Sequence, residues 1–426
     1  MFLTKKYCYI FAFLLLTLFG DVISVAAQTS GNPLFAPLLT ADASALVYRD
    51  TLYVFTGHDE GTTSFVMNSW YIFSTTDMVH WTNHGVKLRA RDFSWSSGQA
   101  FAGHVAEQNG KFYWYCPVLH KTIKGTGKEG FAIGVAVANH PLGPYTDAIG
   151  SVLITDNTPN CITLNIDPFV TVDNGTPYLY WGSWNACRYV KLKPSMIQLD
   201  GSVQTVTLQG FFEAPWIHKR NNTYYFSYAS GYPSTTAYST GPSITGPWTY
   251  KGVINDKIET PVISETNHQA IIEFKGNWYF IYHNTALSKA ATDNTAATNN
   301  GTYERSVCID KLEYNGDGSI KKVVRTTTGV PIIPTTSVQA NLINYHNNAK
   351  QPFSLQALTN GKYAIKLPGN NSNNNTLKIS VYSINGVLLE KIVTTTNNHE
   401  VSLPSGTHIL CVSDGTVRYS QCVNFF

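Results

Sequence analysis

The sequence predicts an all-β protein, a five-bladed β-propeller followed by a small β-rich domain at the C-terminal end. Aromatic residues make up 13% of the chain, with 25 Tyr and 9 Trp, and charged residues make up only 13%. Few stretches show the apolar spacing of a helix, whereas short β-branched and aromatic runs end at Gly or Asn turns, as strands do. One strand–turn–strand pattern also recurs five times, which is typical of a repeat architecture.

The repeated unit has a head residue, a short apolar run, a polar turn about eight positions after the head, and an aromatic strand. In Gly210–Tyr228 the head is Glu213 and the turn is Asn221-Asn222. The other copies are Thr40–Gly57 with Asp42, Phe101–Cys116 with Ala102, Asn165–Gly182 with Asp167, and Asn267–His283 with His268. Equivalent positions of propeller blades meet at the central axis, so we expect these side chains to share one site. A β-sandwich is the alternative fold, but it does not explain the shared register.

Residues 1–27 are predicted to be a secretory signal peptide. Two lysines precede an apolar core, Tyr9–Phe19, and Val25–Ala27 supplies small residues for cleavage. A transmembrane anchor is the alternative, but the apolar core is short and Asp21 interrupts it. We therefore expect a secreted protein, extracellular or at the cell surface, that does not insert into a membrane.

The propeller is expected to span residues 28–335, because the repeats have a period of about 45–65 residues, enough for the four short strands of a blade. Residues 336–360 are polar and are predicted to be a linker. Residues 361–426 are predicted to form the small β-rich domain, because β alternation appears in Thr376–Tyr382 and Val387–Thr394. This last segment contains no motif of catalytic residues.

The formal charge of +3 is too small to indicate a nucleic-acid partner or an anionic membrane surface. Six of the seven cysteines follow the predicted signal peptide. Two disulfide pairings are candidates, Cys161 with Cys187 and Cys411 with Cys422, and buried free thiols are the alternative. No cysteine spacing matches a zinc site. The sequence does not determine the oligomeric state.

Three of the head residues are carboxylates, and two carboxylates across a cavity can cleave a glycosidic bond. Glu213 lies among aromatic residues such as Phe212 and Trp216, so burial should raise its pKa and keep it protonated as a general acid. Asp42 lies among small residues, where water can reach it, and suits a general base. Asp167 could raise the pKa of Glu213 through its like charge and a hydrogen bond. A single Asp at a strand start is more often a cap or turn residue, but three carboxylates in one register favour catalysis.

Three further residues are candidates for binding a substrate or a metal. His268 is either a satisfied structural histidine, a substrate contact, or an axial ligand of calcium, the last only if oxygen ligands complete the shell. Arg305 is either a surface residue or a donor to sugar hydroxyls or to a carboxylate in the pocket. Trp95 is either a core residue or an aromatic platform for a sugar ring.

At these residues the chain resembles glycoside hydrolase family 43, over about residues 33–330. The resemblance rests on ADASALVYRDTLYVFTGHDE with Asp42, IDPFVTVDNGTPYLYWG with Asp167 and EAPWIHKRNNTYYFSY with Glu213, followed by NHQAIIEFKGNWYFIYHN and YERSVCIDKLEYN. It implies a five-bladed propeller that hydrolyses with inversion of configuration. By the same resemblance, Asp42 is the base, Glu213 the acid, and Asp167 the residue that modulates the pKa of the acid and orients it.

The resemblance also relates His268 to a central histidine of the family, often associated with calcium, and Arg305 to an arginine near the sugar subsite. No cofactor is required for the chemistry, although a structural calcium ion remains open. The sequence departs from the family at Ala43, where members usually have proline after the base. This departure could loosen the backbone of the base but leaves its carboxylate in place.

The expected function is therefore that of a secreted inverting glycosidase, releasing α-L-arabinofuranosyl or β-xylosyl units from plant cell-wall polysaccharides such as arabinoxylan or arabinan, or from xylo-oligosaccharides. The alternatives are a non-catalytic carbohydrate-binding propeller and a retaining, fructan-acting five-bladed hydrolase. The final segment, SVYSINGVLLEKI … LPSGTHILCVSDGTVRYSQCVNF, resembles C-terminal sorting domains of Bacteroidetes type IX secretion. A small carbohydrate-binding or spacer domain is the alternative for that segment.

Overall fold

The computed structural model describes residues 29–257, 265–288 and 301–333, together with seven strands between residues 354 and 425. The chain divides into two compact units, Met1–Ile332 and Ile333–Phe426. The predicted signal peptide, residues 1–27, lies outside the described residues, as does the predicted linker apart from the strand Ser354–Ala357.

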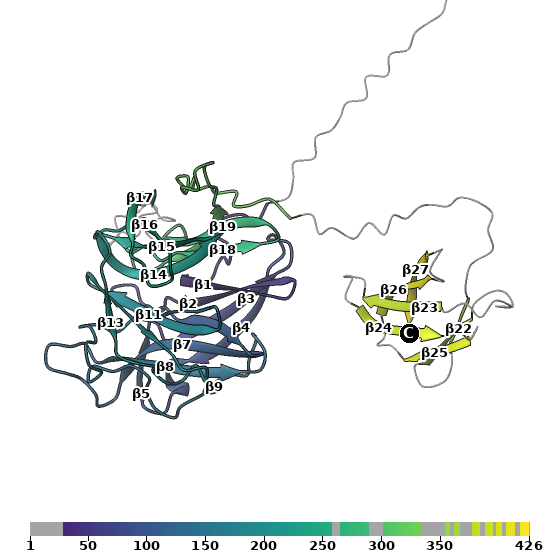
Figure 1. The fold of residues 1–426 in the computed structure, drawn as a ribbon, viewed down its shortest axis with the longest axis horizontal. Helices are drawn as coiled ribbons and strands as arrows, with labels where there is room; N and C mark the ends of the chain where they lie inside the picture. The colour runs from purple at the N-terminus through teal and green to yellow at the C-terminus, as the bar shows by residue number, and fades with distance from the viewer. Residues whose placement is uncertain are drawn as a thin grey trace, which may run out of the picture. The chain divides into compact units, whose positions relative to one another are not determined.

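The larger unit consists of five antiparallel sheets, one for each sequence repeat (Figure 1). The first sheet is β1 (Thr40–Tyr48), β2 (Thr51–His58), β3 (Ser69–Thr75) and β4 (Thr82–Arg89). After the short 3-10 turn η1 (Ala90–Asp92), the second contains β5 (Ser96–Ala100), β6 (His104–Gln108), β7 (Lys111–His120), β8 (Phe131–Ala138) and β9 (Thr146–Asp147). The third is β10 (Phe169–Asp173), β11 (Thr176–Ser183), β12 (Ala186–Lys191) and β13 (Gln204–Val206).

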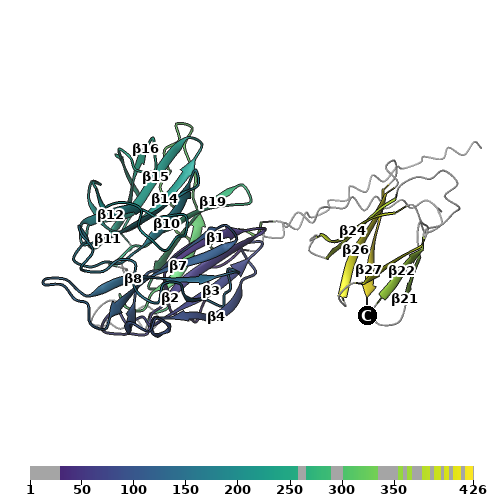
Figure 2. The ribbon, with the colours of Figure 1, turned by 60° about the horizontal axis from the view of Figure 1, so that its bottom comes forward.

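The fourth sheet is β14 (Phe211–Arg220), β15 (Thr223–Ser230), β16 (Thr235–Gly241) and β17 (Thr249–Asn255). The fifth, within the described residues, is β18 (Ala270–Phe274), β19 (Asn277–Asn284) and β20 (Ser306–Lys311). The innermost strands contact one another in a closed circle, β1 with β6, β6 with β10, β10 with β14, β14 with β18, and β18 with β1. Figure 2 shows β1, β10 and β14 towards the middle of this unit, with β4 and β16 at its margin. The predicted five-bladed propeller is confirmed, and the sandwich is excluded.

The hairpin turns of the blades form as their residues predict. Asn174 and Gly175 both have positive φ, 48° and 81°, and Asp173 pairs with Thr176 across them. This is the two-residue turn that Asn-Gly favours, because its twist matches the twist of the flanking strands. The turn sets the distance from the head residue to the far end of the inner strand, and so places each head residue at the same end of the propeller.

The hydrophobic core lies between neighbouring blades. Between the first two blades, Phe55, Trp70 and Trp114 pack with ring centroids 5.1 Å (Phe55–Trp114) and 5.9 Å (Trp70–Trp114) apart. Full burial of one such aromatic side chain stabilises a fold by about 1.5–3 kcal/mol. Large aromatic side chains therefore fill the wedge-shaped space between blades, where the sheets diverge, which accounts for the high aromatic content of the chain.

The ring is closed by the segment before β1, which pairs with the end of the same unit. Thr29 bridges to Pro331, and the N–H of Ser30 donates to the carbonyl of Val330 at 2.8 Å. Asn32 reaches across this seam, donating to the carbonyls of Ile309 (3.0 Å) and Thr326 (2.9 Å). The two ends of the propeller sequence are thus held together by backbone bonds and one side-chain amide.

The smaller unit contains two antiparallel sheets. One has the order β21 (Ser354–Ala357), β22 (Lys362–Lys366) and β25 (Asn398–Ser402). The other has the order β24 (Leu388–Thr394), β23 (Leu377–Ser383), β26 (Gly406–Ser413) and β27 (Arg418–Phe425). The central strand β23 buries Ile379 and Val381. The small C-terminal β domain predicted from the sequence is present.

Within the described part of the chain, no helix has the length and apolar character needed to span a membrane. Cys161 and Cys187 are free thiols, as are Cys116, Cys308 and Cys411, so neither of the two candidate disulfides is formed. The side chain of Cys422 lies outside the described residues.

Candidate active site

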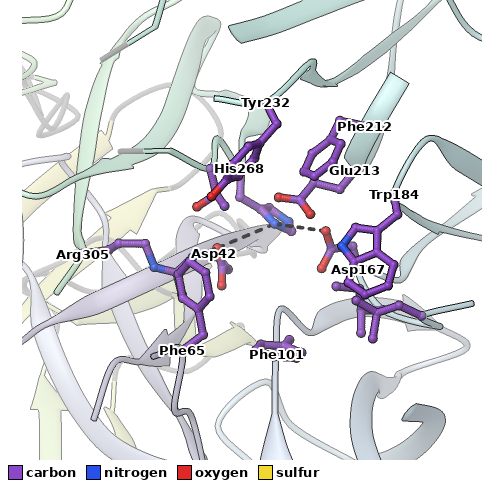
Figure 3. A pocket seen from close by; sticks show the side chains of 13 residues that line it. Asp42, Phe65, Phe101, Asp167, Trp184, Phe212, Glu213, Tyr232, His268 and Arg305 are labelled. Atoms are coloured by element: carbon purple, nitrogen blue, oxygen red, sulfur yellow. Dashed lines mark hydrogen bonds and ion pairs between the residues drawn. The ribbon is translucent and has the colours of Figure 1, made fainter. Parts of the chain in front are cut away.

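A cavity of about 480 Å³ opens where the innermost strands of the blades begin. Three carboxylates, Asp42, Asp167 and Glu213, line it together with His268 and Arg305 (Figure 3). The remaining lining residues are Phe65, Phe101, Leu164, Ile166, Trp184, Phe212, Tyr232 and Thr266. Five predicted site residues from four different blades therefore meet in one hollow.

Asp42 is held from both its backbone and its carboxylate. It has positive φ, 52°, at a bulge in β1, and it is only 6% exposed. Its N–H donates to Nδ1 of His283 at 3.3 Å, while Nε2 of His283 lies 2.9 Å from the carbonyl of Thr266. Because Nδ1 accepts, Nε2 must be the protonated nitrogen, and burial followed by Arg305 lowers the pKa of His283 to about 3. A neutral, fixed imidazole thus secures a backbone conformation that non-glycine residues rarely adopt.

Arg305 joins Asp42 to a second buried carboxylate, Asp59. Its Nη1 donates to Oδ1 of Asp42 at 2.7 Å, and its Nε and Nη2 donate to Asp59 at 2.9 and 2.8 Å. Burial alone would raise the pKa of Asp42, but the positive charge and the hydrogen bond of Arg305 outweigh burial and lower that pKa. Asp42, the candidate base, is therefore ionised because the positive charge of the buried Arg305 guanidinium stabilises its carboxylate.

Asp167 precedes the inner strand of the third blade, and Glu213 lies on the inner strand of the fourth. Oδ2 of Asp167 accepts the N–H of Ala214, the residue after Glu213, at 3.1 Å. Asp167 and Ala214 both have positive φ, 55° and 57°, and β14 has bulges on both sides of Glu213. These irregularities change the direction of the Glu213 side chain, since a bulge bends its strand locally.

Burial raises the pKa of Glu213 to about 8, with a further contribution from the negative charge of Asp42. Burial also raises the pKa of Asp167 well above its usual value, followed by the charges of Glu213 and Asp42. The negative charge of Glu213 thus favours the protonated form of Asp167. Glu213 is half-buried on the cavity wall, whereas Asp167 is buried, so Glu213 is the member that can deliver the proton to a ligand.

His268 lies between two of the carboxylates, with Nδ1 3.8 Å from Oδ1 of Asp42 and 3.8 Å from Oδ2 of Asp167 (Figure 3). Burial lowers its pKa, although Asp42 opposes this, so the imidazole is neutral near pH 7. Calcium prefers about six to eight oxygen ligands. In the described part of the chain no three His, Cys, Asp or Glu side chains are grouped to hold a metal, and Arg305 and Ala214 already occupy the nearest carboxylate oxygens. The side chains around His268 therefore do not fit direct coordination of calcium.

Aromatic side chains surround the carboxylates. Trp184 and Tyr232 keep 48% and 55% of their surface exposed, which is unusual for rings of this size. The ring of Phe212 lies 5.4 Å from that of Tyr232, and Phe65 lies 4.9 Å beneath the guanidinium carbon of Arg305. Flat apolar faces beside hydrogen-bonding groups suit the C–H surfaces and hydroxyls of a sugar.

Trp95 does not line the cavity, so its predicted role as a platform for substrate is not supported. Its indole N–H donates to the carboxylate of Asp147 at 3.0 Å, and its ring stacks on His120 at 5.6 Å. Trp95 packs against the core between the first two blades, which agrees with the alternative prediction that it is a core residue.

Several functional residues were missed in the sequence. Asp59 was visible only as part of the HDE sequence after β2, and its importance comes from a bond to Arg305, 246 positions away. His283 is the penultimate residue of the aromatic strand β19, and no local signal marks it. Trp184 lies in the turn between β11 and β12, where Trp184 and Asn185 both have positive φ, and this placement is visible only in the structure.

Comparison with protein families matches residues 31–320 to "Glycosyl hydrolases family 43". An arabinoxylan arabinofuranohydrolase of Paenibacillus polymyxa is 32% identical over 361 residues, which cover 74% of this chain and 55% of that relative. The chain thus spans little more than half the length of this relative.

Two solved structures have a similar propeller. An α-L-arabinofuranosidase of Clostridium thermocellum is 35% identical with a TM-score of 0.56, covering 70% of this chain and 98% of its own. A β-xylosidase/α-arabinofuranosidase from a compost microbial metagenome, solved in a calcium-free form with xylotriose, is 28% identical with a TM-score of 0.59, covering 69% of this chain and 97% of its own.

Proposed function

The chain belongs to glycosyl hydrolases family 43, and we propose that it is an inverting glycoside hydrolase releasing α-L-arabinofuranosyl or β-xylosyl units from plant hemicellulose. The observation that carries this proposal is the pair of opposite protonation states in one cavity. Arg305 favours the ionised form of Asp42, whereas burial favours the protonated form of Glu213. Inverting hydrolysis requires this combination, a base and an acid acting on the same sugar.

Asp42 is the proposed general base. Its carboxylate removes a proton from a water molecule as the water oxygen forms a bond to the anomeric carbon. Arg305 and His283 hold the carboxylate and the backbone of Asp42, so little reorganisation is needed before reaction.

Glu213 is the proposed general acid. It donates its proton to the glycosidic oxygen while the bond between that oxygen and the anomeric carbon breaks. Asp167 is the proposed modulator, since it accepts the N–H of Ala214 and so fixes the backbone beside Glu213, and since the charge of Glu213 raises its own pKa. After one turnover Asp42 holds a proton and Glu213 lacks one, and exchange with solvent restores both.

The proposed substrate class rests on the aromatic walls and on the named activities of the relatives. Exposed Trp184 and Tyr232 offer ring faces to a chain that carries the sugar in the cavity. Relatives named for arabinofuranosyl release and for xylosyl release both match this chain. A panel of 4-nitrophenyl α-L-arabinofuranoside, 4-nitrophenyl β-D-xyloside, arabinoxylan and linear arabinan decides between them.

The test of this function is Glu213→Gln. We expect hydrolysis of a 4-nitrophenyl glycoside to fall by about 10²–10⁴-fold, because the leaving group loses its acid. A 2,4-dinitrophenyl glycoside should lose far less, because its leaving group needs little protonation. Unchanged turnover with both substrates would favour a carbohydrate-binding propeller without this chemistry. Proton NMR of the first product should show the inverted anomer, and a retained anomer would instead favour the fructan-acting type of mechanism.

Calcium has no catalytic role in this proposal. His268 would supply one nitrogen to a structural ion, and the carboxylates around it are engaged elsewhere. We therefore expect EDTA to leave the rate and the melting temperature of the propeller unchanged. A fall in either that added calcium reverses would contradict this and assign His268 to an ion.

We further propose that residues 1–27 direct export and that residues 361–426 act in sorting to the cell surface or medium. The supporting observations are the charged, apolar and small-residue segments of residues 1–27 and the resemblance of the final segment. N-terminal sequencing of exported protein should begin at Gln28. Export that persists after deletion of residues 361–426 would contradict the sorting role and favour a spacer or binding domain.

A further inference from the structure

A second hollow, of about 560 Å³, lies at the other end of the propeller from the active site. Its residues include Arg220 and Asn221 at the end of β14, and Glu273 near the end of β18. Glu213 and His268 stand at the opposite ends of these two inner strands. Seven residues of extended strand separate Glu213 from Arg220, a span of roughly 20 Å at about 3.3 Å per residue. The two hollows are thus distinct sites on opposite faces.

The second hollow has a pre-organised aromatic floor. Trp278 and Tyr314 both line it, with ring centroids 5.7 Å apart and planes at 77°. The hydroxyl of Tyr314 lies 2.7 Å from Nε2 of His218, which is buried and stacks on Tyr225 at 4.9 Å. Tyr314 is therefore anchored from the protein side, and its ring needs no ordering when a ligand binds.

Positively and negatively charged side chains surround this aromatic floor. The guanidinium carbon of Arg220 lies 4.2 Å over the ring of Tyr314. Within the described part of the chain, neither Arg220 nor Glu273 makes a side-chain hydrogen bond or an ion pair, whereas Lys321 pairs with Glu313 at 3.3 Å. The hollow thus offers free donors and a free acceptor without a strong excess of either charge.

This combination fits a neutral, hydroxyl-rich ligand better than an anion or a peptide. Hydroxyl groups accept from a guanidinium and donate to a carboxylate, and the C–H face of a sugar ring packs on an aromatic side chain. An anion would meet Glu273 and Glu313 as well as the cations. The chemistry therefore matches a short segment of an uncharged oligosaccharide.

We propose that this hollow is a second carbohydrate-binding site, which holds one segment of a hemicellulose chain while the active site acts on another. The proposal rests on the proposed function for the identity of the polymer. Two attachments to one long molecule raise its effective concentration at the active site. A monosaccharide glycoside is too short to reach both sites and gains nothing.

The test compares Trp278→Ala and Arg220→Gln with Tyr250→Ala, a matched control whose ring is 36% exposed on β17 and does not line the hollow. Binding is measured by retardation in gels containing soluble arabinoxylan or linear arabinan, and catalysis with 4-nitrophenyl arabinofuranoside and xyloside. We expect Trp278→Ala and Arg220→Gln to weaken polymer binding by about fivefold to tenfold, corresponding to roughly 1 kcal/mol. Their kcat/KM for the aryl glycosides should equal that of the unmodified protein, and Tyr250→Ala should change neither property.

Unchanged polymer binding in both variants would overturn the proposal. A parallel loss of aryl-glycoside activity and of melting temperature in both would also overturn it, because the two side chains would then only support the fold. Arg220→Gln keeps the test decisive if Trp278→Ala does not fold, since Arg220 lies at the surface end of β14. The proposed function has its own refutation, which is that the unmodified protein cleaves no aryl glycoside. If the unmodified protein cleaves aryl glycosides but is not retarded by any polymer, only the proposal of a second binding site is refuted.

Discussion

At the scale of single residues, the charge of each carboxylate depends on a few neighbours that come from other blades. Asp42 and Glu213 face one cavity, yet the pKa of the first is lowered and that of the second is raised to about 8. The difference arises because Arg305 contacts Asp42 directly, whereas Glu213 lacks a cationic partner at hydrogen-bonding distance within the described residues. Contact with one buried arginine thus distinguishes the ionised carboxylate of Asp42 from the protonated carboxyl group of Glu213.

The pH dependence of kcat/KM should reflect these two groups. The acid acts only when protonated, so activity is present below a pH of about 8 and is lost as the pH rises through the pKa of Glu213. The base acts only when ionised, so activity is lost as the pH falls through the pKa of Asp42, below its usual 3.8. The profile of a 4-nitrophenyl substrate should show the alkaline loss, and a 2,4-dinitrophenyl substrate should show it weakly. An alkaline loss near pH 5 would contradict the assignment of Glu213.

Arg305→Lys tests the support of the base. A lysine keeps the charge but cannot bond both Asp42 and Asp59 with a planar fork. We expect kcat/KM at pH 7 to fall by about 10²-fold, because small displacements of a catalytic group are costly. The acidic limb of the profile should move to higher pH, because Asp42 loses its close cation. Lys251→Met, which removes an exposed charge from β17, is the control, and an unmoved acidic limb in Arg305→Lys would refute this role.

At the scale of elements, irregular strands place the site. Regular strands would alternate side chains strictly between two faces, whereas β1 and β14 have register shifts beside Asp42 and Glu213. Positive φ at Asp42, Asp167 and Ala214 costs about 1–3 kcal/mol per residue, and hydrogen bonds from neighbouring blades hold it in place. The fifth blade thus stabilises the strained part of β1, and the third blade stabilises that of β14.

The seam that closes the ring should be sensitive to Asn32. Asn32→Ala removes its bonds to Ile309 and Thr326 and leaves those backbone groups without a side-chain partner. We expect the free energy of unfolding of the propeller to fall by about 2–3 kcal/mol, measured by urea denaturation with tryptophan fluorescence. Asn83→Ala, at an exposed position of β4, is the matched control and should change it by less than about 0.5 kcal/mol. Equal effects of the two changes would refute a special role for the seam.

At the scale of the whole molecule, the two units have separate cores. The cavity is lined by residues of the larger unit, and the family match ends at residue 320. The smaller unit buries its own apolar side chains, such as Ile379 and Val381, within its sheet. The proposed catalytic residues therefore all belong to the propeller.

A protein that ends at Ile332 should fold and hydrolyse aryl glycosides with unchanged kcat/KM. It retains the whole seam, including the bonds of Ser30 and Asn32 to residues 309–330. A shorter protein that ends at Asp317 lacks Thr326 and Val330 and should unfold at a lower temperature. Circular dichroism and activity measure both, and loss of activity in the longer protein would show that the smaller unit contributes to the site.

The sequence by itself determined the fold and the main chemical groups, because these follow from a local pattern. Asp42, Asp167, Glu213 and His268 occupy one position of a repeated hairpin, and a repeat that closes into a ring must bring that position together. The turn residues and the aromatic strands are likewise properties of short segments, so the five blades and the small β domain could be predicted.

The tertiary structure alone decided how those groups are charged and which aromatics surround them. Asp59 and Arg305, or His283 and Asp42, meet across 246 and 241 positions of sequence, and no local signal reports such a contact. Trp95 and Trp184 are alike as sequence features, but one packs between blades and the other stands on the rim. Burial and partners are properties of three-dimensional packing, and they set pKa and access, which is why the site's chemistry became specific only in the folded chain.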